Sequence, residues 1–288
     1  MTEIRPHVKT MDIVRKHNVS AQKKFGQNFL TDPSILEGIV RAAEITKEDC
    51  VLEIGPGLGS MTQYLAEAAA KVIAIEIDKA LIPVLEDTLR GYDNVTIIQG
   101  DVLKLDLAEI LASQAEGRAV KVVANLPYYI TTPIVMGLLE SKLPLTSITI
   151  MVQKEVADRI KEGPGSKEYG ALSLAVQYYS EPEIMMQVPA ECFFPRPNVD
   201  STVIRLTIYE ETPVKTKDPE LFFAIIRASF NQRRKTLVNG LGSAANLGVT
   251  KEKVREALEK MGLSETVRGE TLSKEQFAAL ADLLTNRD

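Results

Sequence analysis

Four short apolar runs, each followed at once by glycine or polar residues, constrain the fold of this 288-residue chain more than any other feature. The runs are Cys50–Ile54, Val72–Glu76, Val95–Gln99 and Val120–Ala124. Segments with helical patterns separate them, so we predict buried parallel strands that alternate with helices. Open α/β sheets of this kind bind their ligands at the carboxyl ends of the strands, which makes the residues after each run the candidate site.

A glycine turn follows the first run. Its sequence, residues 55–60, is Gly-Pro-Gly-Leu-Gly-Ser, and a helical pattern over 61–71 comes next. Strand, glycine turn and helix favour nucleotide binding, because glycine lets the backbone approach a ligand at a helix N-terminus. The dinucleotide fingerprint needs its third glycine where Ser60 stands. The turn therefore argues against an oxidoreductase and favours a ligand that needs only close backbone approach.

Acidic residues follow the next two runs. Glu76 stands 21 residues after Gly55, where a carboxylate can accept from both hydroxyls of a ribose, in NAD and in S-adenosylmethionine alike. Asp101 follows Gly100 after the third run, and its carboxylate could accept from an adenine amino group. Either acid alone is more often a turn residue than a ligand. Together with the glycine turn, they favour a site for an adenosine.

The fourth run leads into Asn125-Leu126-Pro127-Tyr128. The lone pair of an aromatic amino group such as adenine N6 is delocalised into its ring, which makes the nitrogen a poor nucleophile. A side-chain amide oxygen and a backbone carbonyl can accept its two N–H bonds and localise that lone pair, while a tyrosine ring stacks on the base. The alternative for this tetrapeptide is a strand followed by a proline turn with a tyrosine at its rim.

The ordered motifs of the chain resemble those of the rRNA adenine N6-dimethyltransferases, and most closely the bacterial small-subunit branch. The resemblance runs from about Gln22 to Ser201 and continues more weakly beyond it. The motifs that carry it are Gly26-Gln27-Asn28-Phe29-Leu30, Glu53-Ile54-Gly55-Pro56-Gly57-Leu58-Gly59, Glu76-Ile77-Asp78, Gly100-Asp101, Asn125-Leu126-Pro127-Tyr128-Tyr129-Ile130 and Phe194-Pro195-Arg196-Pro197-Asn198-Val199-Asp200-Ser201.

This resemblance implies a Rossmann-like methyltransferase sheet of about seven strands, the last one antiparallel, with a small helical C-terminal domain. It implies two methyl transfers from S-adenosylmethionine to N6 of each of two adjacent adenosines, in a hairpin near the 3′ end of small-subunit rRNA. The cofactor-binding residues would be Asn28, Leu30, Gly55, Gly57, Glu76, Asp101 and Asn125. The catalytic residues would be Asn125, Leu126, Pro127, Tyr128 and Phe194, with the rings of Tyr128 and Phe194 on the two faces of an extruded adenine.

The remaining patterns organise the chain into a basic N-terminal arm (1–20), a methyltransferase domain (21–209) and a helical C-terminal domain (210–288). A helix over Pro33–Ala43 is capped by Asp32. Further strands are expected over Ser147–Val152, Glu183–Val188 and Thr202–Ile208, and a helix over Tyr169–Tyr179. The C-terminal patterns predict helices over Pro219–Val238, Lys251–Met261 and Lys274–Thr285, the last with a capping box of Ser273 and Gln276.

Composition excludes several other classes. No apolar run approaches the length of a membrane span, and residues 1–10 lack the apolar region of a signal peptide. Two cysteines and two histidines, without a Cys-x-x-Cys pair, cannot assemble a zinc site. The chain also contains no Gly-x-Ser-x-Gly motif of a serine hydrolase. We expect a cytoplasmic monomer with reduced thiols, without a metal and without membrane contact.

The net charge of −5 argues against indiscriminate nucleic-acid binding, but the cations are unevenly placed. Residues 1–24 carry six lysines and arginines against two acids, and residues 221–240 carry four cations and no acid. We predict that Arg233, Arg234 and Lys235 contact rRNA within a pre-ribosomal particle. The alternative for both segments is a solvated helix face.

Two other functions remain open at this point. One is the sister family that dimethylates large-subunit rRNA and confers macrolide resistance. Its members usually carry isoleucine where Leu126 stands and asparagine where Tyr129 stands, so these residues favour the small-subunit enzyme. The other is a non-enzymatic ribosome assembly factor that uses the cofactor fold only as a scaffold. The intact set of Gly55, Glu76, Asp101 and Asn125 argues against a degenerate site.

Overall fold

The computed structural model describes residues 7–285, apart from the side chains of Lys23 and Asn246. These residues form two compact units. The larger unit contains the chain up to residue 157 and residues 181–208, and the smaller unit contains residues 158–180 and the chain from residue 209. Each unit is therefore built from two separate stretches of sequence.

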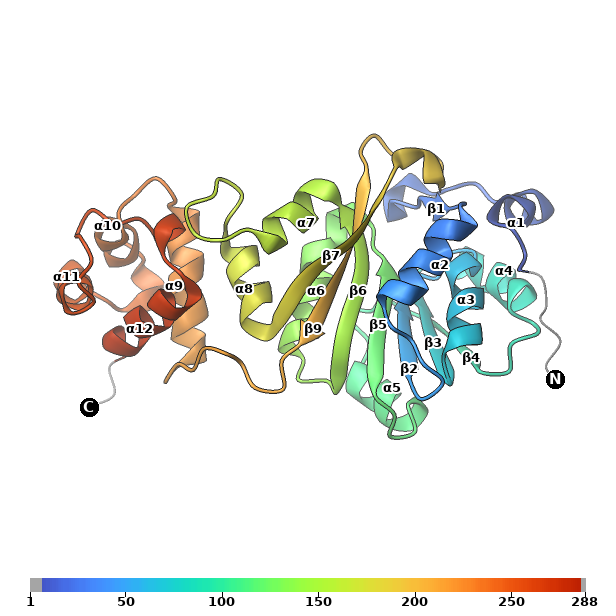
Figure 1. The fold of residues 1–288 in the computed structure, drawn as a ribbon, viewed down its shortest axis with the longest axis horizontal. Helices are drawn as coiled ribbons and strands as arrows, with labels where there is room; N and C mark the ends of the chain where they lie inside the picture. The colour runs from blue at the N-terminus through green and yellow to red at the C-terminus, as the bar shows by residue number, and fades with distance from the viewer. Residues whose placement is uncertain (1–6, 286–288) are drawn as a thin grey trace. The chain divides into compact units, whose positions relative to one another are not determined.

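A seven-stranded sheet forms the centre of the larger unit, as the sequence predicts (Figure 1). Its order is β4-β3-β2-β5-β6-β9-β7. The strands from β4 to β6 are parallel, and β9 is antiparallel to β6. The bounds are β2 (Cys50–Ile54), β3 (Lys71–Glu76), β4 (Val95–Gln99), β5 (Val120–Asn125), β6 (Leu145–Gln153), β7 (Ser180–Val188) and β9 (Ser201–Ile208).

The register of these strands brings the predicted site to one edge of the sheet. Ile54 lies opposite Ile75 of β3 and opposite Ala124 of β5, and Glu76 lies opposite Gln99 of β4. Because the four strands are parallel and in step, the residues that follow them leave the sheet at the same edge.

Helices and two short strands complete the larger unit. In Figure 1, α2 and α3 lie over the face of the sheet that is turned toward the viewer. Strands β1 (Phe29–Leu30) and β8 (Phe193–Phe194) pair with each other in a separate two-stranded sheet. The helices are α1 (Thr10–His17), η1 (Lys23–Phe25), α2 (Pro33–Ala42), α3 (Ser60–Ala68), η2 (Lys79–Leu81), α4 (Ile82–Thr88), α5 (Leu107–Gln114), η3 (Tyr128–Ile130), α6 (Thr131–Glu140), η4 (Ala190–Cys192) and α7 (Lys154–Lys161), which ends in the smaller unit.

Local signals explain where several of these helices begin. The Asp32 side chain accepts from the Ser34 N–H at 2.8 Å and so caps α2, as predicted. Helix α3 is shorter than expected: it ends at Ala68, whereas the sequence pattern predicts a helix that continues to Lys71. Lys71 instead begins β3, where it pairs with Cys50, so strand pairing overrides the local helical preference.

The N-terminal segment contributes more than charge to the larger unit. Helix α1 buries Ile13 and Val14 in a cluster with Phe29 and Leu58. Two of its cations form ion pairs within the chain, Lys16 with Asp87 and, at 3.4 Å, Arg15 with Asp12. Arg5 of the predicted basic arm lies outside the described residues.

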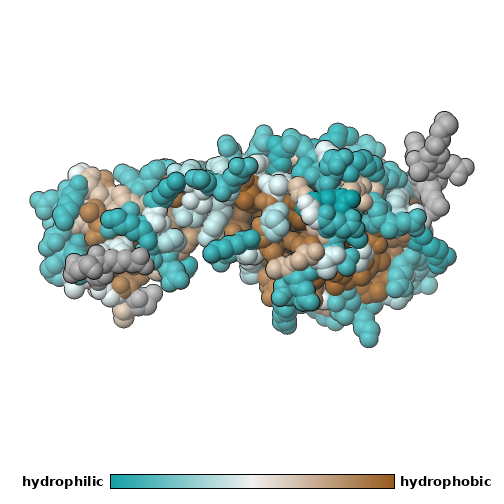
Figure 2. Space-filling model, turned by 90° about the horizontal axis from the view of Figure 1, so that it is seen from below, coloured by the Kyte–Doolittle hydropathy of each residue, from teal (hydrophilic) through white to brown (hydrophobic). Residues whose placement is uncertain are grey.

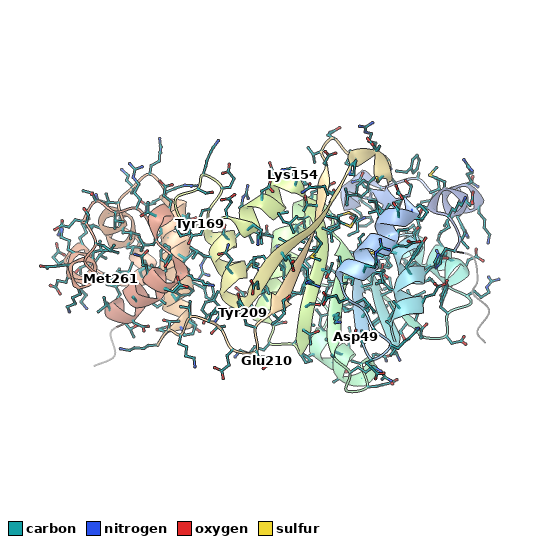
Figure 3. All side chains as sticks on the ribbon, viewed as in Figure 1. Asp49, Lys154, Tyr169, Tyr209, Glu210 and Met261 are labelled. Carbon is teal, nitrogen blue, oxygen red and sulfur yellow. The ribbon has the colours of Figure 1, made fainter. Side chains whose placement is uncertain are left out.

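The core of the smaller unit is apolar and aromatic. Phe222, Phe277 and Tyr169 are its largest fully buried side chains. Tyr169 is labelled in Figure 3. Its hydroxyl donates to the Leu272 carbonyl at 2.8 Å. Its helices are α8 (Ala171–Tyr179), α9 (Pro219–Asn231), α10 (Leu237–Gly242), η5 (Ala245–Leu247), α11 (Lys251–Lys260), η6 (Gly269–Thr271) and α12 (Lys274–Leu284). The capping box of Ser273 and Gln276 at α12 is confirmed.

The prediction of a single helix over residues 219–238 is wrong. Helix α9 ends at Asn231, and α10 begins after Thr236, whose side chain accepts from the Asn239 N–H. The polar residues 232–235 interrupt the apolar periodicity and form a turn instead. Arg233 in this turn bonds to Glu270 and to the Ser166 carbonyl, contacts that local sequence cannot indicate.

Figure 2 shows polar residues over most of the visible face of each unit, with apolar residues gathered in the middle of the larger one. Among the helices within residues 7–285, none combines the length and the apolarity needed to cross a membrane.

Candidate active site

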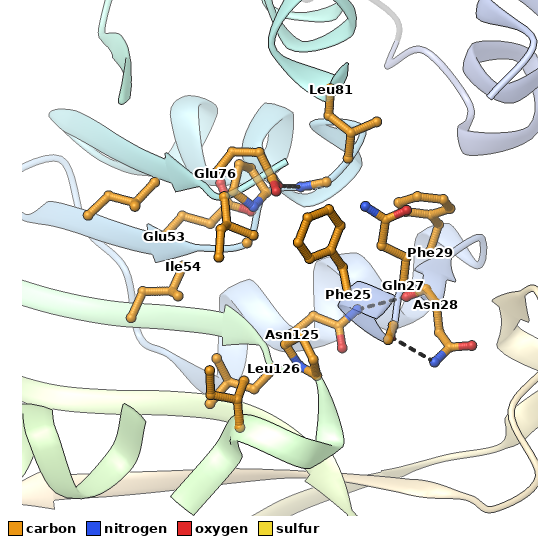
Figure 4. Close-up of a pocket in the computed structure, with 18 of the residues that line it drawn as sticks. Phe25, Gln27, Asn28, Phe29, Glu53, Ile54, Glu76, Leu81, Asn125 and Leu126 are labelled. Atoms are coloured by element: carbon orange, nitrogen blue, oxygen red, sulfur yellow. Dashed lines mark hydrogen bonds between the residues drawn. The ribbon is translucent and has the colours of Figure 1, made fainter. Parts of the chain in front are cut away.

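One pocket at the carboxyl edge of the sheet, called here the strand-end pocket, collects most of the predicted site residues. Figure 4 shows Glu76 and Asn125 on opposite sides of the ring of Phe25. The predicted residues that line the pocket are Asn28, Leu30, Gly55, Gly57, Glu76, Asp101, Asn125, Leu126, Pro127 and Tyr128.

The glycine turn has the backbone that its sequence requires. Gly55, Gly57 and Gly59 have φ angles of +72°, +60° and +80°, a region that side chains with a Cβ rarely adopt. A Cβ at Gly57 would also lie 3.3 Å from the ring of Phe29. Because these glycines have no side chains, the backbone of the turn itself lines the strand-end pocket. Helix α3 begins directly after the turn, at Ser60.

Glu76 joins this turn to the end of β3. One carboxylate oxygen accepts from the Gly57 N–H at 3.0 Å, and the other accepts from the Asp78 N–H at 2.8 Å. The side chain is buried, and this burial raises its pKa although the two backbone bonds act in the opposite direction. Each oxygen has a second lone pair, so the carboxylate can still accept two hydroxyl groups from a ligand in the pocket.

Asp101 lines the strand-end pocket from the end of β4 and is partly exposed. Its Oδ1 accepts from the Leu103 N–H at 3.1 Å, and its Oδ2 lies 3.3 Å from the Lys104 ammonium. These contacts hold the carboxylate at the mouth of the pocket, where it can accept from an amino group.

The amide of Asn125 has a defined orientation. Its Nδ2 donates to the Asn28 carbonyl at 3.1 Å, so Oδ1 is the atom that can accept from a ligand (Figure 4). Leu126 is buried, and its N–H donates to the Met151 carbonyl at 3.4 Å. The Pro127 carbonyl accepts from the Ile130 N–H at 3.1 Å, which begins η3. These bonds fix the backbone around the amide.

The two predicted stacking residues lie on different elements. Tyr128 is half-buried at the start of η3, lines the strand-end pocket, and shares a 3.0 Å hydrogen bond between its hydroxyl and that of Ser201. Phe194 lies on β8, opposite Phe29 of β1, and is 38% exposed. Phe194 is not among the residues that line the pocket, so the structure brings together only part of the predicted catalytic set.

The three predicted RNA-binding cations differ from one another. Arg234 and Lys235 are exposed, but Arg233 is half-buried. Arg233 Nε donates to Glu270 Oε2 at 2.6 Å, and its Nη2 donates to the Ser166 carbonyl at 3.1 Å. Its guanidinium therefore connects three parts of the smaller unit.

Sequence reasoning missed several residues of the strand-end pocket. Phe25 and Gln27 line it from the segment before β1, and Tyr129 lines it with 61% of its side-chain surface exposed. Gln27 and Tyr129 stand inside motifs used for the resemblance, but their partners are distant in sequence. Among the described residues, no group of three histidine, cysteine or acidic side chains could hold a metal ion.

The chain is similar to proteins of known family. A family model described as "Ribosomal RNA adenine dimethylase" matches residues 18–286, a range that includes every predicted site residue. A protein of Lachnoclostridium phytofermentans named "Ribosomal RNA small subunit methyltransferase A" is 59% identical over 279 residues, or 96% of each chain. The solved structure of a dimethyladenosine transferase from Plasmodium falciparum is 27% identical and covers 88% of this chain and 95% of its own, with a TM-score of 0.75. That of the 23S rRNA methyltransferase ErmE is 26% identical and covers 89% and 99%, with a TM-score of 0.67.

Glu53 is a buried acid of the strand-end pocket to which the sequence assigns no role. It lies on β2, and neither carboxyl oxygen has a hydrogen-bond partner among the described residues. The neighbouring Thr62 hydroxyl is also without one. Burial raises the pKa of Glu53 to about 8; the nearby Thr62 hydroxyl acts against this rise, and the negative charge of Glu76 adds to it. Glu53 is therefore largely protonated at neutral pH when the pocket is empty.

We expect Glu53 to make the folded state less stable as pH rises. Above its pKa of about 4.5 in the unfolded chain the carboxyl ionises there, but in the folded state it keeps its proton until about pH 8. Its contribution to the free energy of unfolding should fall by about 1.4 kcal/mol per pH unit across that interval. Glu53→Gln should remove this decline in chemical denaturation at pH 5 to 8. The exposed Glu48→Gln is the control, and parallel pH curves for Glu53→Gln and the parent would refute the assignment.

Proposed function

Because the chain belongs to the ribosomal RNA adenine dimethylase family, we propose that it methylates N6 of two adjacent adenosines in a hairpin near the 3′ end of small-subunit rRNA. The enzyme is an S-adenosylmethionine-dependent rRNA adenine dimethyltransferase. One observation carries the proposal most directly: the Asn125 amide is fixed with its oxygen available in the same pocket as Glu76 and Asp101.

The residues of the strand-end pocket fit the cofactor. Gly55 and Gly57 have positive φ and would leave the backbone open to the methionine part, which Asn28 and Leu30, also in the lining of the pocket, would cover. Glu76, buried and already oriented by two backbone bonds, would hold the ribose hydroxyls. Asp101 would accept from the adenine amino group of the cofactor. The bound cofactor supplies an electrophilic methyl group on a sulfonium that is already a good leaving group.

The chain would activate the target nitrogen by orienting it. Asn125 Oδ1 and the Leu126 carbonyl accept from the N6 amino group, which directs the nitrogen lone pair toward the methyl group. Pro127 fixes the turn that places Tyr128, whose ring would stack on one face of the extruded adenine, with Phe194 on the other. A nitrogen that has gained a methyl group is acidic and loses its proton to water, so no strong side-chain base is required.

Docking on RNA would use surfaces beyond the strand-end pocket. We assign this role to Arg234 and Lys235. Arg233 would contribute only through the guanidinium N–H groups that do not bond to Glu270 or to the Ser166 carbonyl. The basic segment 1–20, the methyltransferase domain 21–209 and the helical domain 210–288 would together contact a pre-ribosomal particle in the cytoplasm. We propose that the chain acts as a monomer.

Large-subunit rRNA is the alternative substrate. The 59% identity to a protein named for the small subunit favours small-subunit rRNA, as do Leu126 and Tyr129. The similarity to the 23S rRNA methyltransferase ErmE, at 26% identity, is the observation that favours large-subunit rRNA.

The test of substrate is labelled-methyl transfer to purified small and large subunits that lack the modification. We expect dimethyladenosine at two adjacent positions of small-subunit rRNA and no product in the large subunit. Label in the large subunit alone would contradict the proposal.

Two alanine variants distinguish cofactor binding from the methyl-transfer step. Glu76→Ala leaves ribose hydroxyls unpaired, which costs about 1–3 kcal/mol, so calorimetry should find at least a tenfold loss of S-adenosylmethionine affinity. Asn125→Ala should leave that affinity nearly unchanged and reduce methyl transfer roughly a hundredfold, because the nucleophile is no longer oriented. If Asn125→Ala turns over at the parental rate, backbone carbonyls alone orient the base.

The stacking role of Tyr128 depends on its ring and not on its hydroxyl. Tyr128→Phe should retain most activity, whereas Tyr128→Ala should lose roughly tenfold to a hundredfold, the equivalent of about 1–3 kcal/mol of base stacking. Ser201→Ala is the matched control because it removes the hydroxyl partner and keeps the ring. Tyr128→Ala should also accumulate monomethyladenosine, since that base offers only one N–H to Asn125 and the carbonyls. Mass spectrometry that detects only dimethyladenosine at partial conversion would argue against this role.

The RNA-docking role predicts a change in salt dependence. Replacing Arg234 and Lys235 with alanine should flatten the salt dependence of subunit binding by roughly one unit of slope per lost phosphate contact. Lys251 and Lys260, exposed on α11 of the same unit, provide a charge-matched control pair. Arg233→Ala should in addition destabilise the smaller unit, because it removes the ion pair with Glu270 and the bond to the Ser166 carbonyl. Equal slopes for the Arg234/Lys235 variant and the control pair would return these residues to a solvated surface.

A further inference from the structure

The segment before β1 forms part of the wall of the strand-end pocket. Residues 22–28, called here the N-terminal strap, contribute Phe25, Gly26, Gln27 and Asn28 to the lining of the pocket. Gly26 has a φ of +60°, and a Cβ there would lie 3.3 Å from the Cβ of Pro127. The strap therefore approaches the Asn125–Tyr128 segment closely, from a distant part of the sequence.

A buried carboxylate binds the strap near both of its ends. Asp78 Oδ2 accepts from Gln27 Nε2 at 2.8 Å and from Gln22 Nε2 at 2.9 Å. The Gln22 N–H in turn donates to Gln27 Oε1 at 2.8 Å, which closes a small network. Only 5% of Asp78 is exposed, so its oxygens have little water to replace these donors.

The same network is connected to both functional halves of the pocket. The Asp78 N–H donates to Glu76, the proposed ribose ligand. Next to Gln27, the Asn28 carbonyl accepts from the Asn125 amide (Figure 4). If the strap moved outward, the Asn125 amide would lose the bond to the Asn28 carbonyl that fixes its rotation.

We propose that Gln27 and Asp78 are positioning residues for methyl transfer, because they hold the N-terminal strap where the Asn28 carbonyl orients the Asn125 amide. The inference rests on the proposed function of Asn125 and extends it to two residues that touch neither the methyl group nor the target nitrogen. Asp78 acts through the strap, and Gln27 connects it to Asn28.

The test exchanges the two partners. Asp78→Asn keeps Oδ1, which accepts from the Ala80 N–H at 3.1 Å, but replaces the acceptor of both glutamines with a donor. Gln27→Glu keeps an oxygen for the Gln22 N–H but places a second carboxylate against Asp78. Combining Asp78→Asn with Gln27→Glu restores one donor and one acceptor between the two positions, with their roles reversed. Asp106→Asn is the control, because Asp106 is exposed and caps α5 through the same kind of bond.

Two readouts follow the strap and the chemistry separately. Hydrogen exchange of residues 22–28 in the free protein, measured by mass spectrometry, should be at least tenfold faster in each single variant and near the parental rate in the combined one. The kcat for methyl transfer should fall at least tenfold in the single variants, with the KM for RNA within about twofold of the parent. The combined variant should recover most of that loss, which an independent structural role of either residue would not produce.

Different results would contradict the strap contact, the positioning role and the proposed function. If hydrogen exchange in the combined variant is as fast as in the faster single variant, Gln27 and Asp78 do not hold the strap through their mutual bond. Restored exchange with an unchanged kcat in the single variants would overturn the positioning role. A parent that methylates no rRNA would mean that the proposed function fails, and the positioning role with it, while hydrogen exchange would still decide whether Gln27 and Asp78 hold the strap.

Discussion

The Glu76 carboxylate is the contact on which the geometry of the pocket depends. It accepts from Gly57 in the turn after β2 and from Asp78 in the turn after β3, so one side chain ties together two strand ends. An anion in a buried position needs such donors, because water is not there to solvate it. The positive φ angles of the glycine turn make the Gly57 N–H available, and the Asp78 side chain extends the same network to the N-terminal strap. Backbone, cofactor site and strap are thus parts of one hydrogen-bonded arrangement.

Much of the larger unit could be predicted because its signals are local. Four apolar runs become parallel strands, and the glycine turn, Glu76, Asp101 and Asn125 follow them at one edge. Strands β2, β3 and β5 are largely buried, but β4 is only partly buried because it lies at the margin of the sheet. The order of the strands is not local information, yet a parallel sheet places every such end together whatever the order. The antiparallel β9 followed from the family resemblance, and its pairing with β6 confirms it.

The features that sequence reasoning missed depend on contacts between distant residues. Arg233 lies in the turn between α9 and α10, and its partners Glu270 and Ser166 are 37 and 67 positions away. In the sequence Gln27 stands out only as part of a motif, because its bond to Asp78 spans 51 positions. Glu53 sits at the end of an apolar run like a strand-end turn residue, and only its burial reveals an unpaired acid. A charge in a sequence does not tell whether it faces a ligand or a partner in the same chain.

The chain passes from the larger unit to the smaller one twice, after residue 157 and again after residue 208. During synthesis, residues 158–180 emerge long before the residues that bury Tyr169, Leu174 and Tyr178, which come from α9 to α12. The larger unit can close once β9 has left the ribosome, whereas the smaller unit must wait for the last helix. An early stop codon near residue 209 would therefore leave a translated fragment whose 158–180 insert displays an apolar surface, an obvious substrate for chaperones and proteases.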